Sequence, residues 1–396
     1  MIKRSLFFYL GTKGACKGTK INLHSMYFRF FRCLASFSFI LLILLRPTAI
    51  SAQNDSIKPK TKKVKVLVFP VVARSIETGW SFGAASALSF RMSQSDTVSR
   101  LSNMQVLALY SLKKQFVAAI NGTQYFKGEK YILGEQFSYS SFPDKFWGLG
   151  KNTADTAEED YRFKQYYIYL HLMRHLGNKF YIGGLFEFQN VMDVEYEKAG
   201  AFDKENIAGR YGYKSSGLGL SFTYDTRNDA FAPDKGIFAQ AFFNRFDKAI
   251  GSDYSYTKVV VDLRKYIRIY KKHVLAMQAY SLSDIGNDIP IRDIAALGGT
   301  NSMRGYYAGR YRDKQLLVFQ SEYRLPLYKR FGAVAFGGLG DVGKNINDFS
   351  MNNLKYSYGA GLRFALTKKE KLNLRLDYGM GKGGNSGFYF QLGEAF

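Results

Sequence analysis

Apolar residues alternate with small or polar ones along almost the whole chain from Val64 to Phe396. Trp80, Phe82 and Leu88, for example, fall on alternate positions, with glycine, serine and alanine between them. A period of two is the pattern of a strand with one apolar face, and helical spacing appears nowhere with comparable strength. The pattern predicts an all-β fold of sixteen strands, at approximately 65–74, 79–92, 102–112, 114–126, 129–141, 161–175, 178–192, 214–226, 236–247, 253–269, 273–284, 314–326, 331–341, 354–366, 371–382 and 387–396.

Strand length separates the two architectures that such strands can build. A soluble β-sandwich buries the apolar face of each strand, whereas a membrane barrel turns that face toward lipid. The runs here span roughly 10 to 16 residues, against ~5–6 for an ordinary strand and ~9–11 for one that crosses a membrane. Tyrosine and phenylalanine also gather near strand ends, as in interfacial girdles. We therefore expect a 16-stranded antiparallel transmembrane β-barrel over residues 64–396.

The connections between the predicted strands fall into a short and a long class. An even number of strands places both ends of the barrel on one side, the periplasmic side in our interpretation. Long connections then face outward, and short ones face the periplasm, which is the asymmetry typical of outer-membrane barrels. The predicted extracellular loops include 142–160, 193–213, 285–313 and 342–353.

The first 52 residues differ in composition from the rest of the chain. They contain eight Lys or Arg and no acid, an apolar run over 34–45, and a small-residue end, Ala49-Ile50-Ser51-Ala52. This is the composition of a secretory signal peptide, for which Met26 is an alternative start. Residues 53–63 then form a short periplasmic tail. Both cysteines, Cys16 and Cys33, leave with the leader, so we expect a mature chain without disulfides or catalytic thiols.

The remaining chemistry does not indicate an enzyme, a metal site or a cofactor. His171, His175 and His273 belong to no Ser/His/acid set at a meaningful spacing. The basic residues are spread over strand ends, so nucleic acid is not an expected partner although the formal charge is +24. Basic pairs such as Lys271-Lys272 lie at predicted periplasmic turns, where they either solubilise the turn or attract anionic lipid head groups.

One stretch combines an unusual loop with two acids on the strands that follow it. The loop reads Gly298-Gly299-Thr300-Asn301-Ser302-Met303-Arg304-Gly305-Tyr306. Glu322 and Asp341 lie on the next two predicted strands, and we expect both side chains to face one interior. The sequence therefore predicts that the loop folds inward and that the Arg304 guanidinium docks on these two carboxylates.

This loop resembles the corresponding motif of the BamA/TamA superfamily of outer-membrane assembly and translocation barrels, also called bacterial surface antigens. The family pattern is Gly-Gly followed by Val-Arg-Gly-Tyr or Phe, and Met303 replaces its valine. Residues 224–236, 320–326 and 336–343 match other parts of the family in the same order. The resemblance implies a barrel whose sixth extracellular loop enters the lumen, with Arg304 paired to Glu322 and Asp341.

The front of the chain departs from the assembly-type members of that family. Those members carry periplasmic POTRA modules before the barrel, whereas here only residues 53–63 separate the predicted cleavage site from the first strand. We therefore expect a short member without such modules. Whether another protein supplies them stays open.

The two ends of the predicted barrel carry features of their own. Pro70 in the first strand cannot donate a ladder hydrogen bond, and the last strand contains Gly387 and Gly393. These residues predict a weak seam between the first and last strands, or alternatively a local bulge at Pro70. Terminal Phe396 resembles an outer-membrane targeting end, although Glu394 interrupts the apolar alternation before it.

These observations predict a non-enzymatic protein of the bacterial outer membrane. The resemblance implies a role in the insertion or translocation of proteins or lipids, with outer-membrane lipids, client proteins and accessory periplasmic or lipoprotein subunits as partners. The alternative is a passive or structural plugged barrel in which Arg304 only stabilises the plug.

Overall fold

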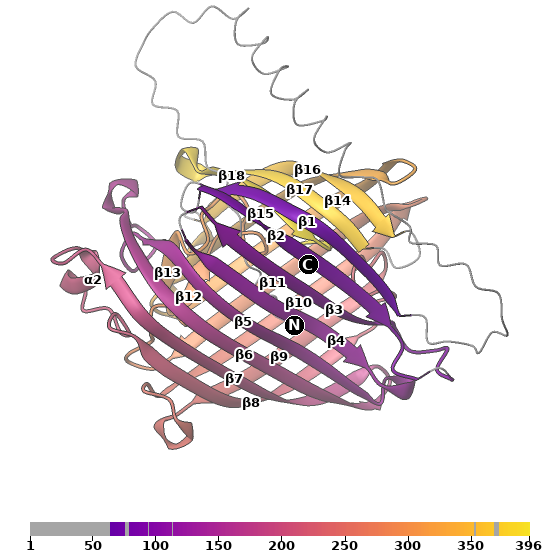
Figure 1. Ribbon diagram of the computed structural model, residues 1–396, viewed down its shortest axis with the longest axis horizontal. Helices are drawn as coiled ribbons and strands as arrows, with labels where there is room; N and C mark the ends of the chain where they lie inside the picture. Colours follow the sequence, from indigo (N-terminus) through magenta and orange to yellow (C-terminus); the bar gives the residue numbers. More distant parts are fainter. Residues whose placement is uncertain (1–63, 76–78, 94, 113, 352–353, 368–371) are drawn as a thin grey trace, which may run out of the picture. The chain divides into compact units, whose positions relative to one another are not determined.

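The computed structural model describes residues 64–75, 79–93, 95–112, 114–351, 354–367 and 372–396. The predicted signal peptide (1–52) and periplasmic tail (53–63) lie outside these residues. Sixteen strands form one antiparallel sheet in which each strand pairs with the next along the chain (Figure 1). Two further strands, β12 and β13, pair with each other inside the connection between β11 and β14.

The strand bounds are β1 Lys65–Ser75, β2 Gly79–Phe90, β3 Ser102–Ser111, β4 Phe116–Tyr125, β5 Tyr131–Phe146, β6 Glu159–Gly177, β7 Phe180–Tyr196, β8 Tyr213–Asp225, β9 Gly236–Phe246, β10 Tyr256–Tyr270, β11 His273–Ile285, β12 Ala295–Leu297, β13 Tyr311–Asp313, β14 Gln315–Tyr328, β15 Phe331–Gly343, β16 Lys355–Thr367, β17 Leu372–Gly381 and β18 Ser386–Leu392. The short helices are η1 Lys127–Glu129, η2 Asp155–Ala157, α2 Ala201–Lys204, η3 Lys248–Ile250, η4 Ile346–Asp348 and η6 Lys382–Gly384.

The prediction of sixteen antiparallel strands is confirmed. The largest error in strand bounds is at β5, which runs 16 residues to Phe146 instead of ending near residue 141. The sequence pattern predicts a loop at residues 142–160, but the ladder to β6 continues through Phe142–Phe163 and Asp144–Tyr161. The sheet order ends at β1 and β18, and no ladder between these two strands is recorded among the described residues.

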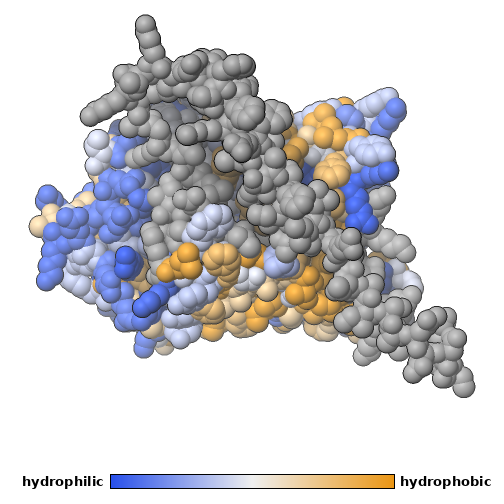
Figure 2. Space-filling model, turned by 45° about the horizontal axis from the view of Figure 1, so that its top comes forward, coloured by the Kyte–Doolittle hydropathy of each residue, from blue (hydrophilic) through white to orange (hydrophobic). Residues whose placement is uncertain are grey.

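The two faces of the sheet have opposite chemistry. On β8, for example, Leu220 and Phe222 are exposed, while Ser221 and Thr223 are buried. Figure 2 shows the exposed apolar side chains as an orange region beside hydrophilic, blue residues. A soluble protein of this size would bury its apolar face, so an exposed apolar face with a buried polar one is the arrangement that lipid requires. Among the described residues, no helix has the length and apolarity needed to span a membrane.

Strands that are far apart in the order of the sheet line the same cavity, so the sheet must curve strongly. Residues from β4, β5, β6, β10, β11 and β18 surround a cavity of about 390 Å³. In Figure 1 the indigo-to-magenta strands cross in front of the orange ones with a different tilt, as expected when one twisted sheet turns back on itself. Part of the wall of this cavity comes from the connection between β11 and β14, which carries the Arg-Gly-Tyr motif.

Candidate functional site

The connection of residues 286–314, which we call the 286–314 segment, is itself folded. The short strands β12 and β13 pair Leu297 with Tyr311 and form a narrow hairpin. At the hairpin end, the Gly298 amide donates to the Ser302 carbonyl at 2.9 Å, and the Gly299 amide donates to the Tyr306 carbonyl at 3.0 Å. Gly298 has φ +110°, and a Cβ there would lie 2.0 Å from the Tyr307 carbonyl oxygen. Only glycine fits such a position, which explains the Gly-Gly opening of the motif.

Arg304 lies at the centre of the site and is almost fully buried, with 2 % of its surface exposed. Its guanidinium contacts Glu322 of β14 at 2.6 Å and Asp377 of β17 at 2.5 Å. The guanidinium carbon also stands 3.6 Å from the centre of the Phe336 ring of β15. We call Arg304, Glu322 and Asp377 the arginine anchor. It connects the 286–314 segment to two strands that are separated by β15 and β16.

The second predicted acid, Asp341, does not contact Arg304; its place is taken by Asp377. Asp341 is itself buried, with 2 % of its surface exposed, but it lies five residues along β15 from Phe336, the ring that the Arg304 guanidinium contacts. The Asp341 carboxylate pairs instead with the Lys355 ammonium at 2.5 Å. The Asp341 side chain is thus buried, but its partner is Lys355 of β16 and not Arg304.

The Arg-Gly-Tyr motif lies along alternate residues of β17. Beyond the contact between Arg304 and Asp377, a Cβ on Gly379 would lie 2.7 Å from the Gly305 amide nitrogen, and a Cβ on Gly305 would lie 2.6 Å from the Met380 carbonyl carbon. Gly305 also has φ +117°. The two backbones therefore touch, and each needs glycine at the crossing.

Tyr306 completes the contact with the sheet. A Cβ on Gly381 would lie 2.6 Å from the Tyr306 ring, and the Tyr306 hydroxyl donates to the Tyr356 carbonyl at 2.8 Å. Burial raises the pKa of Tyr306 to about 12. The Tyr389 hydroxyl of β18 accepts from the Gly305 amide at 2.7 Å and donates to the Tyr306 carbonyl at 3.1 Å. Sequence reasoning missed Asp377, Gly379, Gly381 and Tyr389.

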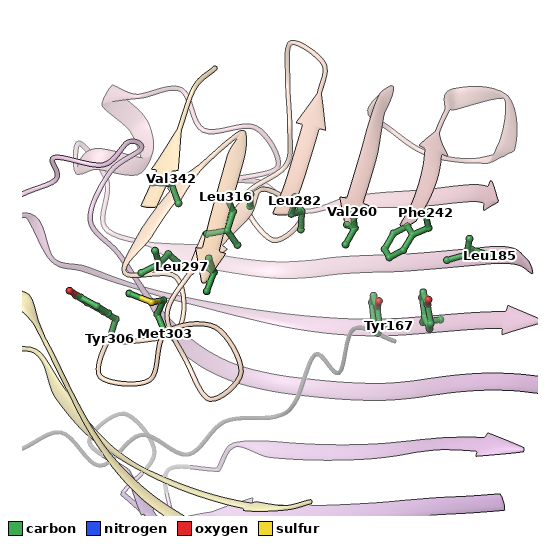
Figure 3. Close-up of a cluster of buried hydrophobic side chains, with 13 residues drawn as sticks. Tyr167, Leu185, Phe242, Val260, Leu282, Leu297, Met303, Tyr306, Leu316 and Val342 are labelled. Carbon is green, nitrogen blue, oxygen red and sulfur yellow. The ribbon is translucent and has the colours of Figure 1, made fainter. Parts of the chain in front are cut away.

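Apolar contacts hold the same segment from the other side. Figure 3 shows Leu297, Met303 and Tyr306 beside Leu316 and Val342. Met303 is completely buried and has φ +68°, a left-handed conformation that is unusual for a residue with a side chain. The apolar cluster keeps Met303 in place despite this strained backbone.

Further charged groups surround the arginine anchor. Arg324 reaches Glu322 at 2.9 Å, and Arg363 reaches Asp377 at 2.5 Å. Arg363 also donates to Glu394, just beyond β18, at 2.8 Å. Both acids of the anchor therefore have a second arginine partner, and this shared bonding extends the network to the end of the chain.

The end of the chain departs from the sequence prediction. Strand β18 ends at Leu392 instead of continuing to Phe396, and Gly393 turns the chain with φ +83°. Phe396 is buried with Tyr266 and Ala276, and its carbonyl accepts from Arg324 at 3.1 Å. A targeting role for Phe396 stays a prediction, but the residue lies off the sheet instead of ending its last strand.

The seam residues lie in the two strands at the ends of the sheet order. Pro70 stands opposite Ala84 of β2, in a ladder whose register does not shift at that point. Gly387 pairs with Gly379, the glycine beneath Gly305. The placement of Pro70 and Gly387 in edge strands is compatible with a seam, and gating at this seam stays a prediction.

The described residues contain no group of three His, Cys, Asp or Glu side chains that could hold a metal ion. His171, which has a buried side chain, shares a hydrogen bond of 2.6 Å with the Ser221 hydroxyl. The arrangement around Arg304 can hold a folded segment against a wall of the sheet by charge, shape and hydrogen bonding.

The fold and the site together define an all-β protein with one sixteen-stranded antiparallel sheet and a folded connecting segment held against that sheet by buried ion pairs. Residues 81–396 match the Omp85 superfamily domain, and the chain belongs to this superfamily. That membership indicates the bacterial outer membrane as its location. No curated protein matches the sequence.

Solved structures with a similar fold include BamA and CdiB. BamA from Haemophilus ducreyi lacking POTRA domains 1–3 aligns with a TM-score of 0.53 at 15 % identity, over 84 % of this chain and 70 % of that one. CdiB from Escherichia coli gives a TM-score of 0.55 at 13 % identity, over 85 % and 63 % of the two chains. CdiB from Acinetobacter baumannii gives 0.52 at 12 % identity, over 82 % and 59 %. This chain thus spans less than two thirds of either CdiB chain.

Proposed function

We propose that the sixteen-stranded sheet closes into a transmembrane barrel between β1 and β18, with the 286–314 segment folded into its lumen. Closure would leave the exposed apolar face toward lipid and enclose the polar face. The cavity lined by strands from β4 to β18 supports this arrangement, because only a sheet that returns toward its beginning brings those strands together. Closure would also satisfy the backbone groups at both edges, as a lipid environment demands.

The protein then acts in the insertion or translocation of proteins, or lipids, at the outer membrane. The observation that carries this proposal is the arginine anchor, a buried cation shared by Glu322 and Asp377. A plug meant only to fill space would be as stable with apolar contacts, since buried ion pairs are seldom more stabilising than apolar residues of the same size. An ionic anchor instead fixes one defined geometry. Outer-membrane lipids and client proteins are the proposed partners, with accessory periplasmic or lipoprotein subunits left open.

A weak seam gives such a barrel a route for its client. Strand β1 pairs with β2 over eleven residues, whereas β18 pairs with β17 over only seven. Because β18 is short and ends before Gly393, part of β1 would stay unpaired when the barrel closes. Disulfides engineered between β1 and β18 test this route, and full function of the oxidised protein would exclude a gating role for the seam.

A passive plugged barrel is the second candidate, and one observation favours it. The 286–314 segment contacts many strands, and the cluster around Leu297 and Met303 alone joins it to β6, β7, β9, β10, β11, β14 and β15. A segment held so widely is suited to staying in place. In that case the arginine anchor contributes stability and no transport.

Depletion of the protein separates the two candidates. We expect a loss of outer-membrane proteins or a change in outer-membrane lipids when the protein is depleted, restored by the wild type and not by Arg304→Ala. Arg245→Ala is a matched control, because Arg245 forms an exposed ion pair with Asp247 at 2.8 Å. An unchanged census of proteins and lipids after full depletion would favour the passive barrel.

A further inference from the structure

We infer that Asp144, near the end of β5, is a second anchor of the 286–314 segment and holds one wall of the cavity shut. The inference rests on the proposed function in taking the cavity as a lumen. Four side chains converge on this carboxylate. Its Oδ2 accepts from the Arg292 guanidinium at 2.5 Å, from the Tyr161 hydroxyl at 2.8 Å and from the Arg312 guanidinium at 3.2 Å. Its Oδ1 accepts from the Tyr307 hydroxyl at 3.0 Å.

Three of these donors belong to one segment. Arg292 precedes strand β12, Tyr307 follows the Arg-Gly-Tyr motif, and Arg312 lies in β13. One carboxylate therefore binds residues from the beginning, the middle and the end of the 286–314 segment. We call Asp144, Arg292, Tyr307 and Arg312 the Asp144 anchor. Tyr161, directly opposite Asp144 on β6, orients the carboxylate from the sheet.

The neighbourhood of Asp144 is built to receive these groups. The Arg292 guanidinium stands 4.4 Å from the centre of the Phe163 ring, and Tyr307 packs edge-on against Trp147 with ring centres 5.2 Å apart. Arg312 also joins the connection after β5, because the Gly150 amide donates to its carbonyl at 2.8 Å. The Phe163 ring and the Asp144 carboxylate together hold the Arg292 guanidinium, so this contact is not a chance surface pair.

The Asp144 anchor lines the cavity together with the segment that it holds. Asp144, Arg292, Tyr307 and Arg312 all contribute to the cavity wall, as do Ala308 and Gly309 beside them. Another part of the wall is the end of the chain, from Glu394 to Phe396. Releasing Asp144 therefore frees one wall of the cavity while Arg304 stays paired with Glu322 and Asp377.

Cysteine accessibility tests the inference directly, because both natural cysteines precede residue 53. Ala308→Cys places a thiol beside the Asp144 anchor, and Ser302→Cys places one beside the arginine anchor. In the full-length protein folded in lipid vesicles, we expect Asp144→Ala to speed maleimide labelling at position 308 by roughly tenfold and to leave labelling at position 302 nearly unchanged, since local opening exposes only the freed part. Arg304→Ala should do the reverse.

A second readout is ion conductance in planar bilayers. Asp144→Ala should raise the frequency of open events above that of the wild type, and Asp160→Ala is the matched control. Asp160 lies on the neighbouring strand, and its carboxylate is largely exposed while it contacts Lys145 at 3.1 Å. Heat-modifiable migration on gels verifies that each variant is folded.

Tyr307→Phe keeps the test valid should Asp144→Ala fail to fold, because it removes one hydrogen bond and no charge. It should produce a smaller rise in labelling at position 308. Equal responses of both cysteines to either substitution, or no response at position 308 in folded variants, would overturn the second anchor. An unchanged census of outer-membrane proteins and lipids after depletion would instead count against the proposed function and leave the anchor intact.

Discussion

The 286–314 segment is tied to the sheet at two places with opposite designs. The arginine anchor puts one cation between two acids, and the side chains of Arg304, Glu322 and Asp377 are at most 1 % exposed. The Asp144 anchor puts one acid among two cations and two phenols, and the side chains of Arg292 and Asp144 are 25 % and 12 % exposed. Solvent therefore reaches the Asp144 anchor and not the arginine anchor. We therefore expect the arginine anchor to contribute more stability and the Asp144 anchor to open more readily.

The largest expected effect is the loss of the buried cation. Arg304→Ala leaves Glu322 and Asp377 in a dry site, although Arg324 and Arg363 still contact them. We expect a loss of ~3–5 kcal/mol in the free energy of unfolding, the usual cost of removing one partner of a buried pair. Urea unfolding in lipid vesicles measures this change, and Asp144→Ala should cost less. Equal losses for Arg304→Ala and Asp144→Ala would remove the contrast between the two anchors.

The next effect comes from the crossing of two backbones. Gly379→Ala would place a Cβ 2.7 Å from the Arg304 carbonyl carbon and the Gly305 amide nitrogen, so one of the backbones must move. We expect a loss of ~1–3 kcal/mol, as for other overpacked positions. Gly337→Ala on β15 is the control, because its Cβ would find its nearest neighbour, the Ser357 carbonyl oxygen, at 3.7 Å. A control as damaging as Gly379→Ala would show that alanine itself, not the crossing, destabilises the sheet.

Alternation along the chain was enough to predict the sheet, because a strand with two different faces must repeat every second residue. The same alternation predicted that the Glu322 side chain is buried, because Glu322 lies on the same face of β14 as the buried residues Leu316 and Val318. The loop glycines could be predicted too, since Gly298 and Gly305 need backbone angles that other residues avoid.

The rest of the site is built by contacts between residues that lie far apart in the sequence. Asp377 lies 73 residues after Arg304, and nothing in the local pattern says which distant strand the loop will touch. One signal was present in the sequence. On one face of β17, Asp377 is followed by Gly379 and Gly381, and two glycines on one face leave room for another backbone to pack closely against the strand. Asp144 fell within the predicted loop 142–160, so its pairing with Tyr161 could not be foreseen.

The smallest expected effect concerns Asp341, and it tests the correction that the structure makes. A double-mutant cycle between Arg304→Ala and Asp341→Ala should give a coupling energy within ~0.5 kcal/mol of zero, because Asp341 pairs with Lys355 and shares no partner with Arg304.

The parallel cycle with Asp377→Ala serves as its positive control. It should give a coupling of ~0.5–3 kcal/mol, as residues in direct contact do. Unfolding in urea supplies both numbers from the same set of variants. A strong coupling of Arg304 to Asp341, with none to Asp377, would mean that Asp341 of β15 is the second partner of Arg304. It would also mean that the Arg-Gly-Tyr motif does not lie along β17.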